Sequence, residues 1–465
     1  MTSHLPCGFN GSAKHRVLLV HSNCSNGGTM SMQQLPGGIS PATSSVAEVG
    51  TSRRGWLVVA ALVLFMVVNW ADRSILGLAA QPMMADLDLT PEQFGFLGSA
   101  FFFLFSISGI VVGFLANRIS SRWLLFALVC VWSLTQLPIV FTSSLAVVLI
   151  SRIVLGAAEG PSNGLATHAA YTWFPPEKRG LPTSFITSGS SIAKFVMAPV
   201  MTFVIVGFGW RAAFLTLAVL GAVWCVLWLA VGREGPYRAA KTPDEAVETT
   251  GERKVPLHRI LLSGSFIGAV LGTFPQYALI TVVMTWLPSY FETALGFSAV
   301  QAGTFFGLPS LGAMIAMIGG SYVTDRVLTR GGTARVARGV VAGAALVIGG
   351  ALIVVLTMLD SPYVVLGMFV LGYGISMCSM PLMYAVVGSL APTRQRAGVL
   401  GVFLALQNSA GIVAPAVAGA LISSAPDEAT GYGTVFLLCG AIVVVGGLVL
   451  TVLVNPERDT RRINA

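Results

Sequence analysis

The sequence predicts an all-α membrane protein with twelve transmembrane helices arranged in two six-helix bundles. Of its 465 residues, 55% are hydrophobic and only 10% are charged, whereas a soluble domain carries roughly 25% charged residues. Long apolar stretches recur from residue 56 to residue 454, each close to the roughly 20 residues that a helix needs to cross a bilayer. The longest internal loop, 232–262, separates six of these stretches from the other six.

The boundaries of the spans follow from where each apolar stretch meets polar or charged residues. We place the first six at 56–81, 94–116, 123–142, 145–171, 183–206 and 210–231. We place the second six at 263–288, 302–323, 338–358, 362–387, 398–422 and 431–454.

The segments outside the spans complete the predicted domain organisation. Residues 1–52 are rich in Gly, Ser and Asn and lack the apolar core of a signal peptide, so we expect a disordered N-terminal tail. The two bundles should occupy 53–231 and 263–456, with the charged loop 232–262 as a linker and 457–465 as a C-terminal tail.

The distribution of basic residues predicts the orientation, because Lys and Arg remain on the cytoplasmic side during insertion. With residue 56 inside, the inner loops and adjacent tails contain twenty-one Lys and Arg residues, and the outer loops contain only Arg211. We therefore expect a multi-pass protein of the plasma (inner) membrane with both termini in the cytoplasm. This topology explains the net charge of +8 without nucleic-acid binding.

Two loop segments are similar to each other and occupy corresponding places in the two halves. GFLANRISSR (113–122) follows the second span and GGSYVTDRVLTR (319–330) follows the eighth. Weak symmetry between six-helix halves is typical of transporters that open alternately to each side. We expect charged residues in these loops to gate that motion; they are Arg118, Arg122, Asp325 and Arg326.

These segments resemble the G-x-L-a-D-R-x-G-R-R loop signature of the major facilitator superfamily, and the resemblance extends over 55–456. It implies the major facilitator fold. The chain departs from the signature at Asn117, where the first-half Asp usually stands, and at Ser120, where a Gly does. The charge relay of this loop is therefore expected to depend on the second copy.

Five charged side chains lie clearly within the predicted spans, away from their ends: Asp72, Arg73, Arg152, Glu159 and Lys194. Inserting each of them into the membrane costs roughly 2.5–3.5 kcal/mol at a helix centre, so we expect these side chains to have a function. Together they carry a formal +1 charge, or +3 with both acids protonated, so the site would attract an organic anion more strongly when protonated. This is the behaviour of a proton symporter. The alternative is an ion-pair cluster, Asp72 with Arg152 or Glu159 with Arg73, that only holds helices together.

The fourth span adds two features to this expectation. Arg152 and Glu159 are seven residues apart, hence on one helix face and about 10 Å apart along the axis. Gly156, Gly160 and Gly164 form a stripe that lets a neighbouring backbone approach closely.

Five segments are similar to one branch of that superfamily, the anion:cation symporters. They are ADR (71–73), RIVLGAAEGP (152–161), WFPPEKRG (173–180), TWLPSYF (285–291) and NSAGIVAP (408–415). The resemblance implies that Asp72 and Glu159 carry protons, that Arg73 binds a substrate carboxylate, and that Arg152 supports the acidic pair. It also implies a hydrogen bond to the substrate from Asn408.

Departures from that branch bear on the substrate. Its sugar-acid members usually have tyrosines near Trp70 and Phe105 and a Gln near Gly109, so this chain favours a less hydroxylated anion. Lys194 could hold a second carboxylate or a sulfonate; alternatively, it extends toward the cytoplasmic interface. Further candidates for substrate contact are the second-half residues Gln276, Tyr277 and Ser379.

The predicted function is proton-coupled uptake of an organic anion, a carboxylate such as a sugar acid or an aromatic or dicarboxylic acid. The alternative is a drug:proton antiporter of the same fold, although SFITSGSSIAKFVMAPVM (184–201) lacks the Gly-Pro pair that such an antiporter favours. A ligand sensor is a third hypothesis, supported only by the N-terminal tail.

An enzyme is not expected, because the sequence has no P-loop, no HExxH and no nucleophile with a base at recognisable spacing. We expect no metal and no cofactor, with the proton as coupling ion. The expected partners are the anion, protons and lipid, and the expected state is a monomer.

Overall fold

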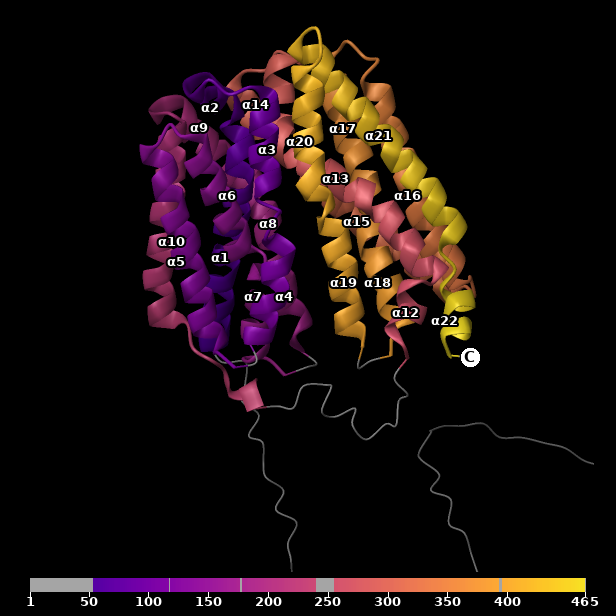
Figure 1. The fold of residues 1–465 in the computed structure, drawn as a ribbon. Helices are drawn as coiled ribbons and strands as arrows, with labels where there is room; N and C mark the ends of the chain where they lie inside the picture. Colours follow the sequence, from indigo (N-terminus) through magenta and orange to yellow (C-terminus); the bar gives the residue numbers. More distant parts are fainter. Residues whose placement is uncertain (1–52, 117, 176–177, 240–254, 393–394, 465) are drawn as a thin grey trace, which may run out of the picture. The chain divides into compact units, whose positions relative to one another are not determined.

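The computed structural model describes residues 53–464 except 117, 176–177, 240–254 and 393–394. The predicted tail 1–52 and the signature position Asn117 lie outside the described residues. All the regular elements of the described part are helices (Figure 1), and twelve helices in it are long and apolar enough to cross a membrane. The predicted fold class is confirmed.

The helices of the first half follow the six predicted spans within a few residues. They are α1 (Arg53–Leu78), α2 (Ala80–Leu87), α3 (Pro91–Ala100), α4 (Phe105–Leu115), α5 (Ser121–Phe141), α6 (Leu145–Glu159), α7 (Ser162–Tyr171), α8 (Gly180–Ile192), the π-helical turn η2 (Ala193–Met197), α9 (Ala198–Phe208) and α10 (Trp210–Val231).

The second half begins after the short 3₁₀ turn η3 (Pro236–Ala239). Its elements are α12 (Leu257–Leu261), α13 (Gly264–Thr293), α14 (Ala299–Phe305), α15 (Leu308–Thr329), the π-helical segment η5 (Arg335–Val340), α16 (Val341–Leu356), α17 (Pro362–Met377), α18 (Ser379–Leu390), α19 (Arg396–Asn408), α20 (Ala410–Ser423), α21 (Glu428–Leu453) and α22 (Pro456–Asn464).

Three spans of the first half lose regular α-helical geometry part-way along their length. The second span turns between α3 and α4, at Phe101–Leu104, and the fourth is interrupted at Gly160–Pro161, directly after Glu159. The fifth widens into η2. Broken helices are tolerated in membranes where protein or a water-filled site satisfies the freed backbone groups, and π-turns are frequent at functional sites.

The same N-terminal capping motif occurs once in each half. A capping box of Thr90 with Gln93 begins α3, and a capping box of Ser298 with Gln301 begins α14. In each box the hydroxyl accepts from the third helical N–H while the glutamine side chain accepts from the cap N–H. The second and eighth spans therefore start in the same way, which supports the internal repeat.

The halves contact each other at the end where α2 and α3 begin, the upper end in Figure 1, here called the loop end. There the Ser99 hydroxyl accepts a hydrogen bond of 3.0 Å from the Ala416 N–H. A side chain at Gly77 would overlap the Met284 backbone oxygen. The opposite end, here called the linker end, carries the start of α1 and α22; no hydrogen bond joins the halves there among the described residues.

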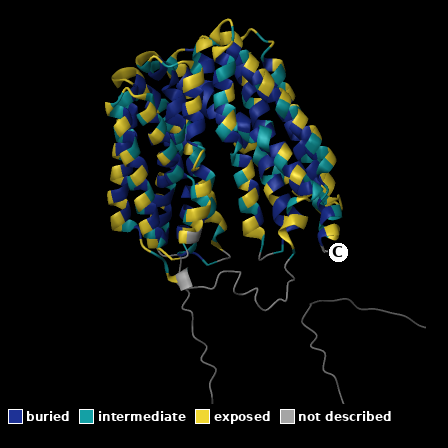
Figure 2. Cartoon of the chain, in the orientation of Figure 1, coloured by how far each residue is buried: buried dark blue, intermediate teal, exposed yellow. Residues whose placement is uncertain are grey.

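Large apolar side chains remain exposed along the outer faces of the helices, where Figure 2 shows many exposed residues. Phe141, Phe203 and Val452 are each more than two-thirds exposed. Because lipid is as apolar as these side chains, such faces are expected on membrane spans.

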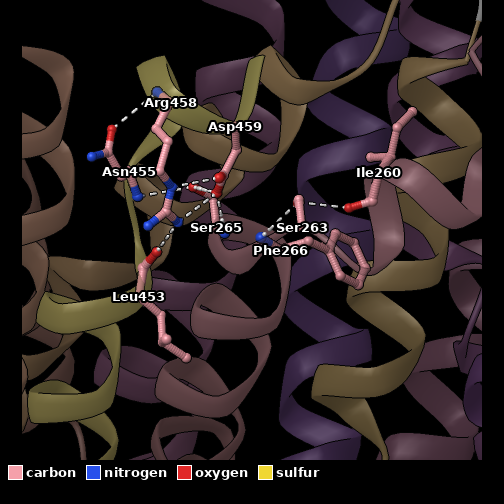
Figure 3. A network of polar contacts seen from close by, with 8 residues as sticks. All are labelled: Ile260, Ser263, Ser265, Phe266, Leu453, Asn455, Arg458 and Asp459. Atoms are coloured by element: carbon pink, nitrogen blue, oxygen red, sulfur yellow. Dashed lines mark hydrogen bonds and ion pairs between the residues drawn. The ribbon is translucent and has the colours of Figure 1, made fainter. Parts of the chain in front are cut away.

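The predicted C-terminal tail contains a helix, α22, that docks on the second half (Figure 3). The Asp459 carboxylate accepts hydrogen bonds of 2.7 Å from both the N–H and the hydroxyl of Ser265, in the first turn of α13. Arg458 donates to the same carboxylate at 2.8 Å, and Glu457 accepts from the Ala334 N–H at 2.6 Å. The last helix therefore supplies acceptors for backbone donors at the starts of two other helices.

Candidate functional site

Four of the charged residues predicted within the spans gather between α1 and α6, and we call Asp72, Arg73, Arg152 and Glu159 the charged cluster. The Nε of Arg73 donates to Glu159 Oε2 at 2.9 Å, and its Nη2 donates to the Glu159 backbone oxygen at 3.5 Å. The carboxylate is fully buried, and the Arg73 side chain is 13% exposed. Of the two ion pairs that the sequence allowed, this one forms.

Asp72 forms no ion pair within 4 Å in the described part of the chain; a neutral side chain from α5 contacts it instead. Gln136 Nε2 donates to Asp72 Oδ1 at 2.8 Å, and Oδ2 has no hydrogen-bond partner among the described residues. Both residues are fully buried. Sequence reasoning missed Gln136, although an amide in the apolar third span is a visible signal, since buried amides usually have specific partners.

Arg152 is buried and only partly satisfied. Its Nε and Nη1 have no hydrogen-bond partner among the described residues, and its Cζ lies 5.2 Å from the centre of the Phe101 ring. A cation over an aromatic face gains some electrostatic stabilisation, but less than a paired carboxylate provides. The guanidinium is therefore available to stabilise negative charge on the neighbouring acids.

The glycines of the fourth span bring the second span against the charged cluster. A Cβ at Gly156 would overlap the Phe101 backbone oxygen, and one at Gly160 would overlap that of Phe105. The predicted close approach is thus present at these two positions. Gly164 has open space around its Cα instead.

Aromatic rings surround the partly exposed guanidinium of Arg73. Its Cζ lies 4.7 Å from the centre of the Trp70 ring and 4.8 Å from that of Phe105. The Nζ of Lys194 lies 4.8 Å from the centre of the same Trp70 ring. Lys194 therefore points to the neighbourhood of Arg73 and does not extend toward an interface.

The second-half candidates differ in how far they are already engaged. Gln276 Nε2 donates to Ser376 Oγ at 3.0 Å, and the Ser379 hydroxyl donates to the Ser376 backbone oxygen at 2.8 Å; all three are buried. Tyr277 is half-buried, with its ring 6.3 Å from that of Phe102 in the first half. Asn408, at the end of α19, is half-buried. Tyr277 therefore lies against an aromatic ring of the first half.

The proposed gating residues lie mostly on helices and not in loops, because α5 begins earlier and α15 ends later than predicted. Arg122 is in the first turn of α5 and donates to the Leu229 backbone oxygen at 2.8 Å. Asp325 and Arg326 are exposed near the end of α15, where Arg326 donates to the Tyr322 hydroxyl at 2.7 Å. Of the four, only Arg118 lies between helices, and it is exposed. Their role in gating remains a prediction.

A depression of about 320 Å³ follows α7 away from the charged cluster. Polar residues of α7 line it. They are Asn163, Thr167, His168 and Tyr171, with Gly164 among them. The side of α7 that borders this depression is therefore polar.

Known proteins resemble the chain over most of its length. The Major Facilitator Superfamily profile matches residues 62–415. The hexuronate transporter of Bacillus subtilis is 28% identical over 409 residues, which cover 86% of this chain and 94% of that protein. The probable sulfoacetate transporter of Cupriavidus necator is 27% identical over 413 residues, with the same 86% and 94% coverage.

A solved structure has the same fold. A bacterial homologue of the human lysosomal transporter Spinster, in its inward-facing and unoccupied conformation, aligns with a TM-score of 0.72 and 17% identity over 89% of this chain and 99% of its own. The relatives and this fold are those of transporters, so the expectation that the chain is not an enzyme is confirmed. With twelve spans and a profile match over most of its length, the chain belongs to the Major Facilitator Superfamily.

Proposed function

We propose that the protein is a secondary active transporter that takes up a small organic anion, a carboxylate, together with protons by alternating access. The observation that carries the proposal is the buried ion pair between Arg73 and Glu159. The second buried acid, Asp72, directly precedes Arg73 in the sequence. Arg73 is the member of the charged cluster that retains accessible surface and lies beside aromatic rings.

The ion pair makes anion binding and proton binding depend on each other. A substrate carboxylate that binds Arg73 must compete with the Glu159 carboxylate for the same guanidinium. Protonating Glu159 removes its charge and weakens its hold on Arg73, so proton and anion bind more favourably together than singly. Release of both restores the ion pair in the empty carrier.

Both acids have an oxygen at which a proton can be accommodated. Asp72 Oδ2 and Glu159 Oε1 are buried and have no hydrogen-bond partner among the described residues. A buried acceptor without a partner costs free energy, and protonation converts a carboxylate oxygen into a hydroxyl donor. Gln136, on the other oxygen of Asp72, would hold that carboxyl in place in either protonation state.

The relatives support an organic anion as substrate, since the names of two of them specify hexuronate and sulfoacetate. The surroundings of Arg73 favour an anion with few hydroxyl groups, because Trp70 and Phe105 present rings without hydroxyls. Gly109 offers no side chain for a hydrogen bond. Aromatic acids and dicarboxylates fit this description better than sugar acids do.

Alternating access is supported by the contacts between the halves, which are at the loop end, and by the polar depression along α7. By the positive-inside rule the linker end is cytoplasmic. We therefore propose an inward-open carrier of the plasma (inner) membrane with both termini in the cytoplasm. We propose that it acts as a monomer, since each chain has its own charged cluster.

The test is external pH in a weakly buffered suspension of cells that express the protein. A panel of sugar acids, aromatic carboxylates, dicarboxylates and sulfonates is added one at a time. Alkalinisation with one anion, absent in Asp72→Asn and present in Asp88→Asn, supports proton symport. Asp88 is the matched control because it is exposed and has a left-handed backbone conformation (φ 52°) that Asn also tolerates.

A different response would contradict the proposal. If no anion changes external pH but lipophilic cations release protons, the protein is an antiporter. If Asp72→Asn transports like the wild type, Asp72 serves packing, and the proposed role of this acid in coupling is wrong.

A further inference from the structure

Lys194 is a second cation near Arg73, and among the residues that the structure describes it forms no ion pair with an acid. Its Nζ lies 4.8 Å from the centre of the Trp70 ring, whose centre is also 4.7 Å from the Arg73 Cζ. Within the described residues no carboxylate lies within 4 Å of Lys194, whereas Arg73 is paired with Glu159. Because both groups contact the same ring, the distance between the Arg73 Cζ and the Lys194 Nζ cannot exceed the sum of these two distances.

A solitary ammonium at this place needs a counter-charge. Lys194 is on the fifth membrane span and only partly exposed, and a charge at membrane depth costs roughly 2.5–3.5 kcal/mol on insertion scales. A cation–π contact with Trp70 returns only about 0.5–2 kcal/mol. A lysine that merely fixed packing would be expected to pair with an acid or to extend to the interface, and this one does neither.

The backbone presents Lys194 in a specific way. It is the second residue of η2, where the helix widens into a π-turn, and such turns are over-represented at functional sites. The second half packs directly on this turn, since a Cβ at Gly307 would lie 2.6 Å from the Lys194 backbone oxygen. Lys194 is therefore held between Trp70 and the contact of the two halves.

We propose that Lys194 is a second anion-binding group and that the substrate is a small dianion. One carboxylate binds Arg73, and a second carboxylate or a sulfonate binds Lys194; the Trp70 ring contacts both cations. This inference depends on the proposed function, because it assigns the substrate class of the same site. Its chemical basis is that each anionic end then has its own cation, and a monoanion leaves Lys194 unpaired.

The experiment compares two anions that differ only at one end. Binding of succinate and butyrate, which have no hydroxyl groups and differ in one terminal carboxylate, is measured by calorimetry on the purified full-length protein, with sulfoacetate as a second dianion. The variants are Lys194→Gln, which removes the charge, and Lys194→Arg, which keeps it. Lys178→Gln is the matched control, because Lys178 is an exposed lysine outside the spans.

We expect the wild type to bind at least one dianion about tenfold or more tightly than the monoanion, the difference that one charge-assisted hydrogen bond produces. Lys194→Gln should remove that preference while changing monoanion affinity less than about twofold, and Lys194→Arg should retain it. Lys178→Gln should behave like the wild type.

The failures of the two proposals are distinguishable. Equal affinity of the wild type for dianion and monoanion, or an equal loss for both in Lys194→Gln, overturns the role of Lys194 and leaves the proposed function standing. Wild-type protein that binds no anion of the wider uptake panel overturns the proposed function itself. If Lys194→Gln does not fold, the wild-type preference and the Lys194→Arg variant still decide the question.

Discussion

Replacing Glu159 with Gln tests the ion pair on which the proposed coupling depends. The variant keeps the shape of the side chain and an oxygen that can accept from Arg73 Nε, which is 2.9 Å from the carboxylate in the wild type. The contact of Arg73 with the Glu159 backbone oxygen is unaffected. What changes is the charge, which becomes permanently that of the protonated acid.

The structure allows the effect on anion binding to be worked out. A hydrogen bond to a charged group contributes roughly 1.5–3 kcal/mol and a neutral one roughly 0.5–1.5. The substitution therefore lowers the cost of freeing Arg73 by about 1–1.5 kcal/mol, or about tenfold in anion affinity. We expect Glu159→Gln to bind the anion about tenfold more tightly than the wild type does at alkaline pH.

Two assays separate binding from coupling. Affinity for the anion identified in the uptake panel is measured by calorimetry across pH, and transport is measured in proteoliposomes. Glu159→Gln should show an affinity that depends less on pH than that of the wild type, because Asp72 is then the remaining buried acid of the charged cluster that can take up a proton. The variant should retain exchange of labelled for unlabelled anion and lose accumulation driven by a proton gradient. Glu92→Gln, the same change at an exposed acid in the first turn of α3, is the matched control.

The reasoning would be refuted by a Glu159→Gln variant that keeps the wild-type pH dependence of binding and still accumulates the anion. The Arg73–Glu159 pair would then hold α1 against α6 without any part in coupling.

Three further predictions concern the surroundings of the charged cluster and the C-terminal helix. Gly156→Ala should lower the apparent melting temperature, since overpacking costs about 1–3 kcal/mol. Gly164→Ala should not lower it, because there is open space at the Gly164 Cα. Equal melting temperatures of the two variants would contradict the close approach of the second span. Gln136→Leu should reduce gradient-driven uptake, because it leaves the Asp72 carboxylate without its partner; uptake at the wild-type rate would show that Gln136 does not position this acid. Asp459→Asn should lower the melting temperature by a similar amount from about pH 5 to about pH 8. Burial alone would raise the pKa of Asp459, but the hydrogen bonds to its carboxylate outweigh burial and hold the pKa below the usual 3.8. The stabilising effect of the ionised carboxylate is therefore complete above pH 3.8 and is lost only as pH falls through the lowered pKa. A difference that shrinks between about pH 8 and pH 5 would contradict this assignment.

The number and places of the spans were predictable because the bilayer imposes a local requirement. Each crossing needs a run of about 20 apolar residues, and such runs can be read without knowing what they contact. The ends were less predictable: the span expected to end at 323 continues to Thr329, because polar residues in a helix end are as acceptable in the headgroup region as in a loop. The helix α22 was missed for a related reason, since its stability comes from the contacts of Asp459 with a distant part of the chain.

The charges within the spans were also evident from the sequence, since each is expensive in lipid and few occur. Which of them pair was not. Two pairings of Asp72, Arg73, Arg152 and Glu159 were consistent with their spacing, and only helix packing selected Arg73 with Glu159.

The order of residues is therefore enough to predict a twelve-span membrane protein with a few functional charges in its spans. The arrangement of the site depends on the folded structure, which places Gln136 on Asp72 and Trp70 in contact with both Arg73 and Lys194. The two kinds of feature differ in the distance along the chain over which they act. Hydropathy and insertion cost depend on residues adjacent in the chain, whereas hydrogen bonds and ion pairs at about 3 Å depend on how separate helices pack.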